Sequence, residues 1–446
     1  MRYEEYKKCD CGWLDKIPSG WSTIPIKRTV KNILTSFIDG DWIESNVITS
    51  DGIRYLTTGN VGALEYKEQG NGHISEETFK ELNCSEVFPG DMLISRLNEP
   101  IGRTCIVPNI GNRIVVAVDN VIYRPDENKY DKRYLMYQMN CLPYTENANY
   151  IARGSTMSRI SRTMLGSIKL CIPTLQEQQT IACYLDERCG KINGAIDVQK
   201  KKIDLLNELK QTIITNAVTK GLNPNAPMKD SGVEWIGEVP NHWLVGRVKD
   251  CTIKIGSGKT PKGGADVYSD EGVLFIRSQN VYSTGLKLDE ATYISEEIDT
   301  TMKGTRVYFG DVLLNITGGS IGRSCIYTNK ENHANVNQHV CIIRVNEHCC
   351  ARYMNYFWIS NVGKVSIDIY QSGANREGMN FEQIANTTIP VPNIIEQEQI
   401  SNYLDEKCSK IERLIKQKEQ VIEKLTEYKK SLIYECVTGK IEVRER

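Results

Sequence analysis

The sequence predicts an α+β fold with two similar globular domains, joined by two long helices that form an antiparallel coiled coil with pseudo-twofold symmetry. Three observations predict it. The chain of 446 residues repeats itself at a spacing near 220. Each copy begins with short β-rich runs bounded by turn residues, and each copy ends in a long heptad pattern.

The internal repeat is carried by matching residues along both copies. Trp13 and Trp21 recur as Trp235 and Trp243, each 222 residues later. The tripeptide Ile-Gly-Arg at 101–103 recurs at 321–323, and Tyr-Leu-Asp-Glu at 184–187 recurs at 403–406. A spacing this long exceeds that of any solenoid repeat, so it indicates a duplicated module of one globular part and one helix.

The globular parts are predicted at 1–172 and 233–391, with a linker rich in Pro, Gly and Asn at 221–232. Runs at 272–277, 311–316 and 340–344 are typical of strands, because apolar residues are bounded there by Gly, Asn and Asp. Shorter helices are expected at 132–142 and 351–360. This mixture of elements predicts the α+β class for each part.

Two long helices are predicted at 173–220 and 392–446, and each of these ranges begins with a proline. Apolar residues recur there every seven positions, while Lys210 and Lys429 interrupt the seam at matching places. The second globular part is large enough to separate the helix ends, which favours an antiparallel pair. The predicted seam consists of Leu185, Ile192, Ile196, Ile203, Leu206, Ile213, Leu404, Ile411, Ile415, Ile422, Leu425 and Leu432.

Composition excludes several classes of protein. The chain has 55 Lys+Arg against 56 Asp+Glu, which argues against a polybasic, histone-like binder but not against locally basic surfaces. No apolar run approaches the roughly 18 residues of a membrane helix, and the start has no secretory signal. Fifteen cysteines without disulfide-scaffold spacing are typical of reduced thiols, so we expect a cytoplasmic protein.

Catalytic and metal-binding motifs are also missing from the sequence. Gly258-Lys259-Thr260 resembles the end of a phosphate loop, but Ile253 stands where the first glycine is needed. No Asn/Asp-Pro-Pro-Tyr/Phe motif for adenine methylation is present. The cysteines and histidines lack the spacing of zinc sites, so no metal site is predicted. Asp126 and Glu127 leave a nuclease open as an alternative.

Locally basic loops indicate where a nucleic acid could bind. Residues 150–171 carry four bases and no acid, and residues 246–264 carry five bases against one acid. These loops also contain hydroxyls, glycines and amides, which suit contacts with phosphates and base edges. The predicted DNA-contacting residues are Arg153, Ser155, Thr156, Arg159, Ser257, Lys259, Thr260, Arg277, Gln279, Asn280, Asn375 and Arg376.

The chain resembles the specificity subunits of type I restriction–modification systems over essentially its full length. The resemblance rests on the run from Met228 to Trp243 and on the helix openings at 172–178 and 391–397, each followed by Tyr-Leu-Asp-Glu. It implies that each globular part is a target recognition domain for one half of a split DNA sequence, with the coiled coil as spacer. It also implies a subunit without a catalytic site.

The resemblance implies partners as well. These are double-stranded DNA, two methyltransferase subunits, and restriction subunits that join through the methyltransferase core. S-adenosylmethionine, ATP and Mg are expected on those partners, with no cofactor on this chain and no membrane. The loop at 154–159 reads GSTMSR where the second copy reads GANREG, which favours an asymmetric target. The alternative function is a coiled-coil scaffold or regulator without sequence-specific DNA binding.

Overall fold

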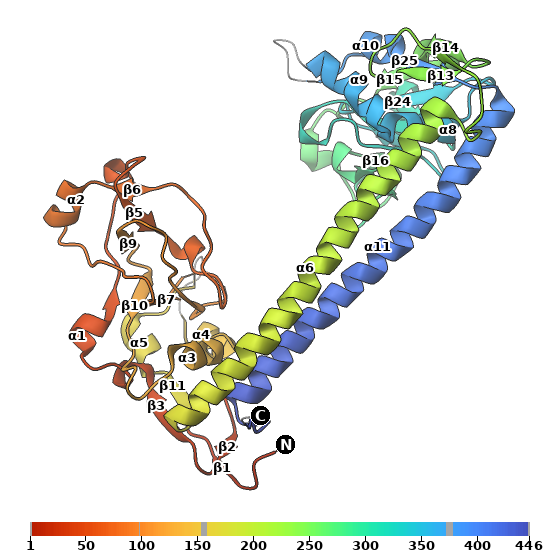
Figure 1. Cartoon of the computed structure of the whole chain (residues 1–446). Helices are drawn as coiled ribbons and strands as arrows, with labels where there is room; N and C mark the ends of the chain where they lie inside the picture. The colour runs from red at the N-terminus through yellow and green to blue at the C-terminus, as the bar shows by residue number, and fades with distance from the viewer. Residues whose placement is uncertain (1, 98, 153–157, 372–377, 445–446) are drawn as a thin grey trace. The chain divides into compact units, whose positions relative to one another are not determined.

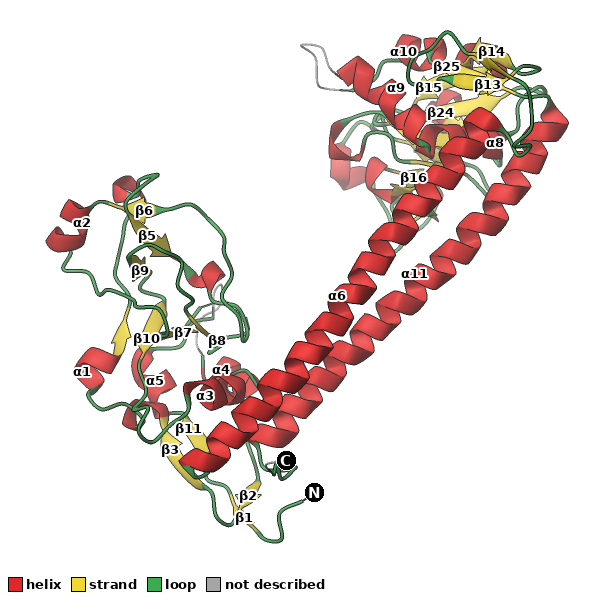
Figure 2. Cartoon of the chain, viewed as in Figure 1, coloured by secondary structure: helices red, strands yellow, loops and turns green. Residues whose placement is uncertain are grey.

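The computed structural model describes residues 2–97, 99–152, 158–371 and 378–444 (Figure 1). It divides into two compact units. The first unit comprises residues 1–199 and 420–446, and the second comprises residues 200–419. Each unit contains one globular lobe, part of helix α6 (Leu175–Lys220) and part of helix α11 (Ile394–Val437). The mixed helix and strand content is visible in Figure 2 and confirms the predicted α+β class.

The lobe of the first unit is built on two small sheets. The four-stranded sheet has the order β4–β10–β7–β8 and is antiparallel throughout: β4 (Phe37–Asp39), β10 (Asn120–Tyr123), β7 (Met92–Ser95) and β8 (Thr104–Ile106). The three-stranded sheet has the order β6–β5–β9: β6 (His73–Ile74), β5 (Ile53–Leu56) and β9 (Ile114–Val116).

Shorter elements complete the first lobe. Its ladder pairs are β1 (Tyr6–Lys8) with β2 (Lys16–Pro18), and β3 (Ser22–Pro25) with β11 (Lys169–Ile172). Its helices are α1 (Ile33–Ser36), α2 (Glu76–Glu81), α3 (Lys132–Met139), α4 (Leu142–Ile151) and α5 (Arg162–Ser167).

The lobe of the second unit repeats this architecture. Its antiparallel sheet has the order β15–β24–β21–β22: β15 (Thr252–Ser257), β24 (Val340–Val345), β21 (Val312–Asn315) and β22 (Ser324–Ile326). The second sheet has the order β19–β16–β23–β20: β19 (Tyr293–Ile294), β16 (Val273–Ile276), β23 (Ala334–Val336) and β20 (Arg306–Val307). All three runs that the sequence predicts as strands, 272–277, 311–316 and 340–344, contain strands, which are β16, β21 and β24.

The remaining elements of the second lobe also have counterparts in the first. Its paired strands are β12 (Met228–Asp230) with β13 (Glu238–Pro240), β14 (Leu244–Arg247) with β25 (Thr388–Val391), and β17 (Val281–Tyr282) with β18 (Gly285–Leu286), where the first lobe has the isolated bridge between Val61 and Tyr66. Its helices are α7 (Glu296–Thr301), α8 (Ala351–Ile359), α9 (Asn361–Gln371) and α10 (Phe381–Asn386).

The long helices run antiparallel within each unit. In the first unit, the start of α6 around Leu185 shares a hydrophobic core with the end of α11 around Leu432. In the second unit, the end of α6 around Ile214 shares a core with the start of α11 around Leu404. The twelve residues of the predicted seam are buried or half-buried, as an apolar stripe between two helices requires.

The polar interruptions of the seam join the two helices. In the second unit, Lys210 Nζ bonds Glu412 Oε1 at 2.6 Å, and the lysine side chain is only 14% exposed. In the first unit, Lys429 Nζ donates to Asn193 Oδ1 at 2.8 Å. The two pairs occupy equivalent positions of the repeat, 219 residues apart. A polar pair at one seam position fixes the register, because a shifted helix would leave it unpaired.

The repeated motifs at the helix openings attach each helix to its lobe. Gln178 and Gln397 are fully buried, and each accepts a hydrogen bond from a lobe backbone amide, Asp131 N and Cys350 N respectively. The aspartate of each Tyr-Leu-Asp-Glu segment accepts a hydrogen bond from a tyrosine of its lobe, which lies on α3 in the first lobe and on α8 in the second. These bonds are Tyr137 Oη to Asp186, at 2.8 Å, and Tyr356 Oη to Asp405, at 2.6 Å.

None of the described helices is both long enough and apolar enough to cross a membrane. All fifteen cysteines are free thiols.

Candidate nucleic-acid interface

In the second lobe, the ends of several strands meet around one turn. Gly258 N, just after β15, donates to Asn337 O at 3.2 Å, and Asn337 N donates to Ile276 O at the end of β16, at 3.1 Å. Ile316 N, just after β21, donates to His339 O at 3.0 Å. We call the surface formed by 257–260, 277–280, 317–320 and 337–339 the strand-end edge of the second lobe.

A close backbone approach fixes this edge. A Cβ atom on Gly258 would lie 1.5 Å from the carbonyl oxygen of Val336, so only glycine fits there. Gly40 is in the same situation in the first lobe, with Val116 O at 2.2 Å. Both glycines directly follow the edge strand of the four-stranded sheet, which holds the residues next to them in a defined place.

Several predicted contact residues lie on this edge. Ser257 ends β15, Lys259 and Thr260 are exposed beyond it, and Gln279 is exposed after β16. Arg277 is half-buried with its guanidinium 5.9 Å from the ring centre of Tyr268. The structure therefore brings together two predicted loops that are separate in the sequence.

Asn280 has a different environment from the one predicted. It is 4% exposed; its Oδ1 accepts from Arg277 N and its Nδ2 donates to Lys287 O, both at 2.9 Å. Asn60 makes the same kind of bonds in the first lobe, to Thr57 N and Lys67 O. Because these amides are used by the backbone, we assign Asn280 to the frame of the lobe and leave it out of the candidate interface.

Sequence reasoning missed three polar residues of the edge. Thr260 bonds to the side chain of Gln338, which is exposed. Thr317 Oγ1 lies 2.7 Å from Nδ1 of His339, the residue that follows Gln338. These side chains come from the turns after β21 and β23, so only the meeting of strand ends places them beside Lys259 and Thr260. Arg153, Ser155, Thr156, Asn375 and Arg376 lie outside the described residues.

The first lobe has a strand-end edge with equivalent backbone hydrogen bonds. We define it by residues 39–41, 58–60, 96–97 and 117–119, and residues 158–162 lie beside it. Arg96 N donates to Asp119 O at 2.8 Å, which matches the bond from Ile316 N to His339 O. Asp39 pairs with Val121 as Ser257 pairs with Cys341. The equivalent backbone bonds identify which side chains of the two lobes correspond.

The side chains at these equivalent positions differ in charge. The first lobe has an ion-pair network in which Arg96 NH2 lies 3.2 Å and Arg162 Nε 3.4 Å from Asp39. The predicted contact residue Arg159 pairs with Asp119 at 2.7 Å and is 43% exposed at its side chain. The second lobe has Ser257, Ile316 and His339 where the first has Asp39, Arg96 and Asp119. The two edges therefore present different chemistry on one frame.

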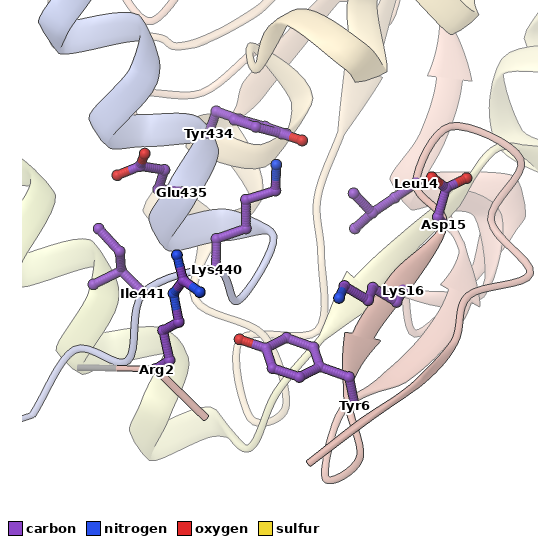
Figure 3. Close-up of a pocket in the computed structure, with 9 residues that line it drawn as sticks. All are labelled: Arg2, Tyr6, Leu14, Asp15, Lys16, Tyr434, Glu435, Lys440 and Ile441. Atoms are coloured by element: carbon purple, nitrogen blue, oxygen red, sulfur yellow. The ribbon is translucent and has the colours of Figure 1, made fainter. Parts of the chain in front are cut away.

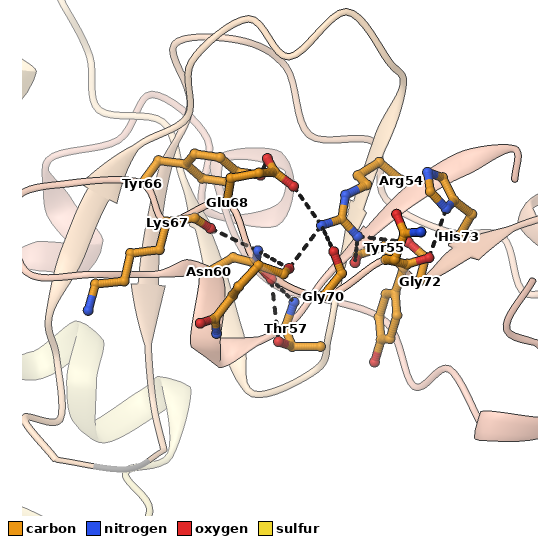
Figure 4. Close-up of polar contacts among 12 residues, drawn as sticks. Arg54, Tyr55, Thr57, Asn60, Tyr66, Lys67, Glu68, Gly70, Gly72 and His73 are labelled. Atoms are coloured by element: carbon orange, nitrogen blue, oxygen red, sulfur yellow. Dashed lines mark hydrogen bonds and ion pairs between the residues drawn. The ribbon is translucent and has the colours of Figure 1, made fainter. Parts of the chain in front are cut away.

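A buried arginine holds a loop next to the first edge (Figure 4). Arg54 donates to the carbonyls of Gly72, Gln69 and Gly70 at 2.8–2.9 Å and pairs with Glu68 at 2.9 Å. The second lobe has Leu274 at this position, since Arg54 pairs with His73 as Leu274 pairs with Tyr293. Arg54 is 4% exposed, which makes it part of the frame rather than a contact for DNA.

Other candidate sites have weaker geometry. Asp126 and Glu127 pair with different lysines, Lys31 and Lys132, each at 3.5 Å. In the described part of the chain, the one grouping of potential metal ligands consists of thiols, so these two acids do not form the carboxylate cluster that a nuclease needs. This removes the support for the nuclease alternative.

A cavity of about 660 Å³ lies between the β1–β2 hairpin and the end of α11 (Figure 3). Its lining mixes bases with acids: Arg2, Lys16 and Lys440 with Asp15 and Glu435. Tyr6 Oη donates to Gly439 O at 2.9 Å and joins the two sides. The mixed charge does not favour a phosphate backbone.

Comparison with known proteins identifies the class. A family model for the type I restriction modification DNA specificity domain matches residues 27–212 and 240–424. The chain therefore belongs to this family and contains its domain twice. Specificity subunits of the family are non-catalytic and bind DNA in assemblies with other restriction–modification subunits.

Proteins named as type I restriction enzyme specificity subunits match most of the chain. The putative type I restriction enzyme MjaX specificity subunit of Methanocaldococcus jannaschii is 25% identical over 99% of this chain and 97% of its own length. The type I restriction enzyme EcoBI specificity subunit of Escherichia coli is 22% identical, covering 81% of this chain and 75% of its own. A solved structure from work on complex assembly and conformational transition of the type I R-M system shares the fold, with a TM-score of 0.70, 13% identity, and coverage of 96% of this chain and 100% of that one.

Proposed function

We propose that the strand-end edges of the two lobes read the two halves of a bipartite DNA target. One observation carries this proposal. The two strand-end edges have equivalent backbone hydrogen bonds, but the side chains at equivalent positions differ. The second edge offers the hydroxyls of Ser257 and Thr260, the amide of Gln338 and the imidazole of His339, whereas the first edge offers arginines held by aspartates. Such groups discriminate bases in the major groove at about 1–3 kcal/mol per bidentate contact.

The proposed functional division follows the repeat. Target recognition domains comprise 1–172 and 233–391, spacer helices comprise 173–220 and 392–446, and a linker comprises 221–232. The register-fixing pairs Lys210–Glu412 and Lys429–Asn193 support a spacer of defined length, because each holds one end of the helix pair in one alignment.

The proposed partners are two methyltransferase subunits, with restriction subunits attached through them. S-adenosylmethionine, ATP and Mg would bind to those partners. The internal duplication supports two methyltransferase sites, since each lobe with its adjoining helix segments offers an equivalent surface. The free thiols fit the reducing cytoplasm, where we propose that the complex acts.

Mapping methylated adenines tests the proposal. The chain is expressed with its methyltransferase partner in a host that lacks other adenine methylation, and methylated sites are determined genome-wide. We expect one split sequence with two unlike halves. Arg159→Ala, which removes the partner of Asp119 at the first edge, should relax or weaken one half, and Lys259→Ala at the second edge should weaken the other. Methylation of an undivided sequence, or of a split sequence that neither substitution affects, contradicts the proposed reading by the strand-end edges.

A further inference from the structure

Three thiols of the first unit lie against one another. Cys9 and Cys11 belong to the loop between β1 and β2, and Cys171 belongs to β11. Cys9 Sγ lies 2.9 Å from Cys11 Sγ and 3.9 Å from Cys171 Sγ, and the three sulfurs all lie within 4.8 Å of one another. All three residues are buried, with exposed fractions of 7%, 8% and 0%.

The loop is fastened so that its thiols face Cys171. Asp10, between the two cysteines, accepts hydrogen bonds from Thr23 Oγ1 and Lys169 Nζ, both at 2.5 Å. Thr23 is the ladder partner of Cys171, so Asp10 holds the loop on the same strand pair. Gly12 has a φ of +86°, a conformation that lets the chain turn directly after Cys11.

Cys171 is held in place by its own backbone. Its amide donates to Gln138 Oε1 at 2.9 Å, and its carbonyl accepts from Gln138 Nε2 and Tyr134 Oη, both at 2.8 Å. Gln138 and Tyr134 are themselves fully buried. The third sulfur therefore has a fixed position beneath the loop, as preorganised ligands require.

The second lobe supplies an internal comparison. Its hairpin β12–β13 matches β1–β2, and its strand β25 matches β11, yet the equivalent residues are Ser231, Val233 and Pro390. Ser231 Oγ bonds within its own turn, to the backbone of Val233. The frame therefore forms without any of the three thiols, and packing of the hairpin does not account for their presence in the first lobe.

We propose that Cys9, Cys11 and Cys171 form a site for a thiophilic metal ion, Zn(II) or Cu(I), which binds the β1–β2 hairpin to β11. Sulfurs bound at about 2.3 Å to one ion are about 3.8–4.0 Å apart. The Cys9–Cys171 separation already has this value, and the Cys9–Cys11 pair has to open by about 1 Å. Thiolate ligands select these ions over hard cations.

The binding reaction releases protons. Three thiols and one ion give a tris-thiolate complex and three protons, with no change of oxidation state. A net charge of −1 remains with Zn(II) and of −2 with Cu(I). Because the thiols are buried, the smaller residual charge of the zinc complex favours Zn(II). A set of three sulfur ligands, in contrast, suits Cu(I). The two ions are therefore tested separately.

The test uses the full chain with the exposed Cys183 replaced by serine, which removes an accessible thiol. The protein is titrated without oxygen with ZnCl₂ or with a Cu(I)–acetonitrile complex, and bound metal is measured after passage over a chelating resin. We expect one ion per chain. The variant Cys9→Ser/Cys11→Val, which copies Ser231 and Val233 of the second lobe, should lose it.

Alkylation provides a measurement that does not depend on the variant. Iodoacetamide is added in urea at a concentration that exposes the buried thiols Cys9, Cys11 and Cys171 in the metal-free protein. Bound metal should slow their labelling, as identified by peptide mass spectrometry, and leave the labelling of Cys350 unchanged. Retention of either ion identifies which metal the site takes. Equal metal content in the parent and the double variant, no retention of either ion, or protection of other cysteines instead would overturn the proposal.

Discussion

Tyr353 Oη donates a hydrogen bond to the backbone carbonyl of Val218, 3.1 Å away, in the last turn of α6. Tyr353 belongs to the second copy of the repeat and Val218 to the first. The first unit has the counterpart, in which Tyr134 donates to Val437 O at 3.4 Å near the end of α11. Each lobe therefore holds the end of the helix that the other copy encodes.

Replacing Tyr353 with phenylalanine should destabilise the second unit. The hydroxyl is fully buried and donates to both Val218 O and Pro390 O, at 3.1 and 2.8 Å. Its loss leaves these carbonyls without that donor, which costs about 1–3 kcal/mol. Urea unfolding should report the loss, with Tyr428→Phe, at an exposed tyrosine of α11, as a control that unfolds like the parent. Equal midpoints for both variants would show that the bond contributes nothing.

The ion pair between Lys210 and Glu412 should be energetically coupled. Lys210→Glu places two acids side by side in the seam, and adding Glu412→Lys restores opposite charges. We expect a coupling free energy of about 1 kcal/mol from a double-mutant cycle measured by thermal unfolding. Lys202→Glu, at an exposed position of α6, should show no such coupling to Glu412. Additive effects at Lys210 and Glu412 would argue against a register-fixing pair.

Gln338→Ala should change only one half of the recognised sequence. The side chain lies on the edge of the second lobe beside Thr260, where a glutamine can bond bidentately to adenine. Loss of such a contact, worth about 1–3 kcal/mol, should relax one base position about 5- to 150-fold in methylation maps. Asn332→Ala, in the turn that precedes β23 rather than the one that follows it, is the matched control. Identical maps for parent and Gln338→Ala would remove Gln338 from the interface.

Acid should weaken the second unit through Asp299. Burial raises the pKa of this carboxyl, but hydrogen bonds from Arg306 and His333 outweigh it, and the pKa lies below the ordinary value of 3.8. The stabilisation is therefore present above about pH 3.8 and is lost as the pH falls through the lower, folded-state pKa.

Asp299→Asn measures this contribution. The difference in unfolding free energy between the parent and this variant should shrink as the pH is lowered below 3.8. The exposed Asp289→Asn is the control, and its free energy of unfolding should match that of the parent at neutral pH. A difference between parent and Asp299→Asn that stays constant with pH would show that the ionised carboxylate is not the stabilising group.

Lengthening the coiled coil should lengthen the gap between half-sites. One heptad inserted into both α6 and α11 adds about 10 Å of helix while it preserves the seam. At about 3.4 Å per base pair, the methylated sequence should gain about three base pairs between its halves. An insertion of equal length into the linker 221–232 alone should leave the gap unchanged. An unchanged gap in a folded complex with longer helices would contradict the spacer role.

The repeat, the lobe class and the two helices could be predicted because they rest on periodicity and self-similarity, which the sequence carries directly. The strand-end edge could be predicted only in part. Gln338 and His339 join it because β15, β16, β21 and β23 end at one place, which depends on long-range pairing. Asn280 is predicted on the interface, but its side-chain amide bonds to the backbone of its own lobe. The sequence around an asparagine does not distinguish an amide that bonds to the backbone from one that faces outward.

The division of the chain has a consequence for its synthesis. The second unit is continuous and comprises residues 200–419. The first unit begins at the N-terminus, but its hydrophobic core is completed only by residues of the segment 420–446. On a ribosome, which makes about 5–20 residues each second, the later lobe can close its core before the earlier one can. Until α11 arrives, the apolar faces of Leu185 and Cys189 lack their partners, so the first lobe spends that interval exposed to aggregation and to chaperones.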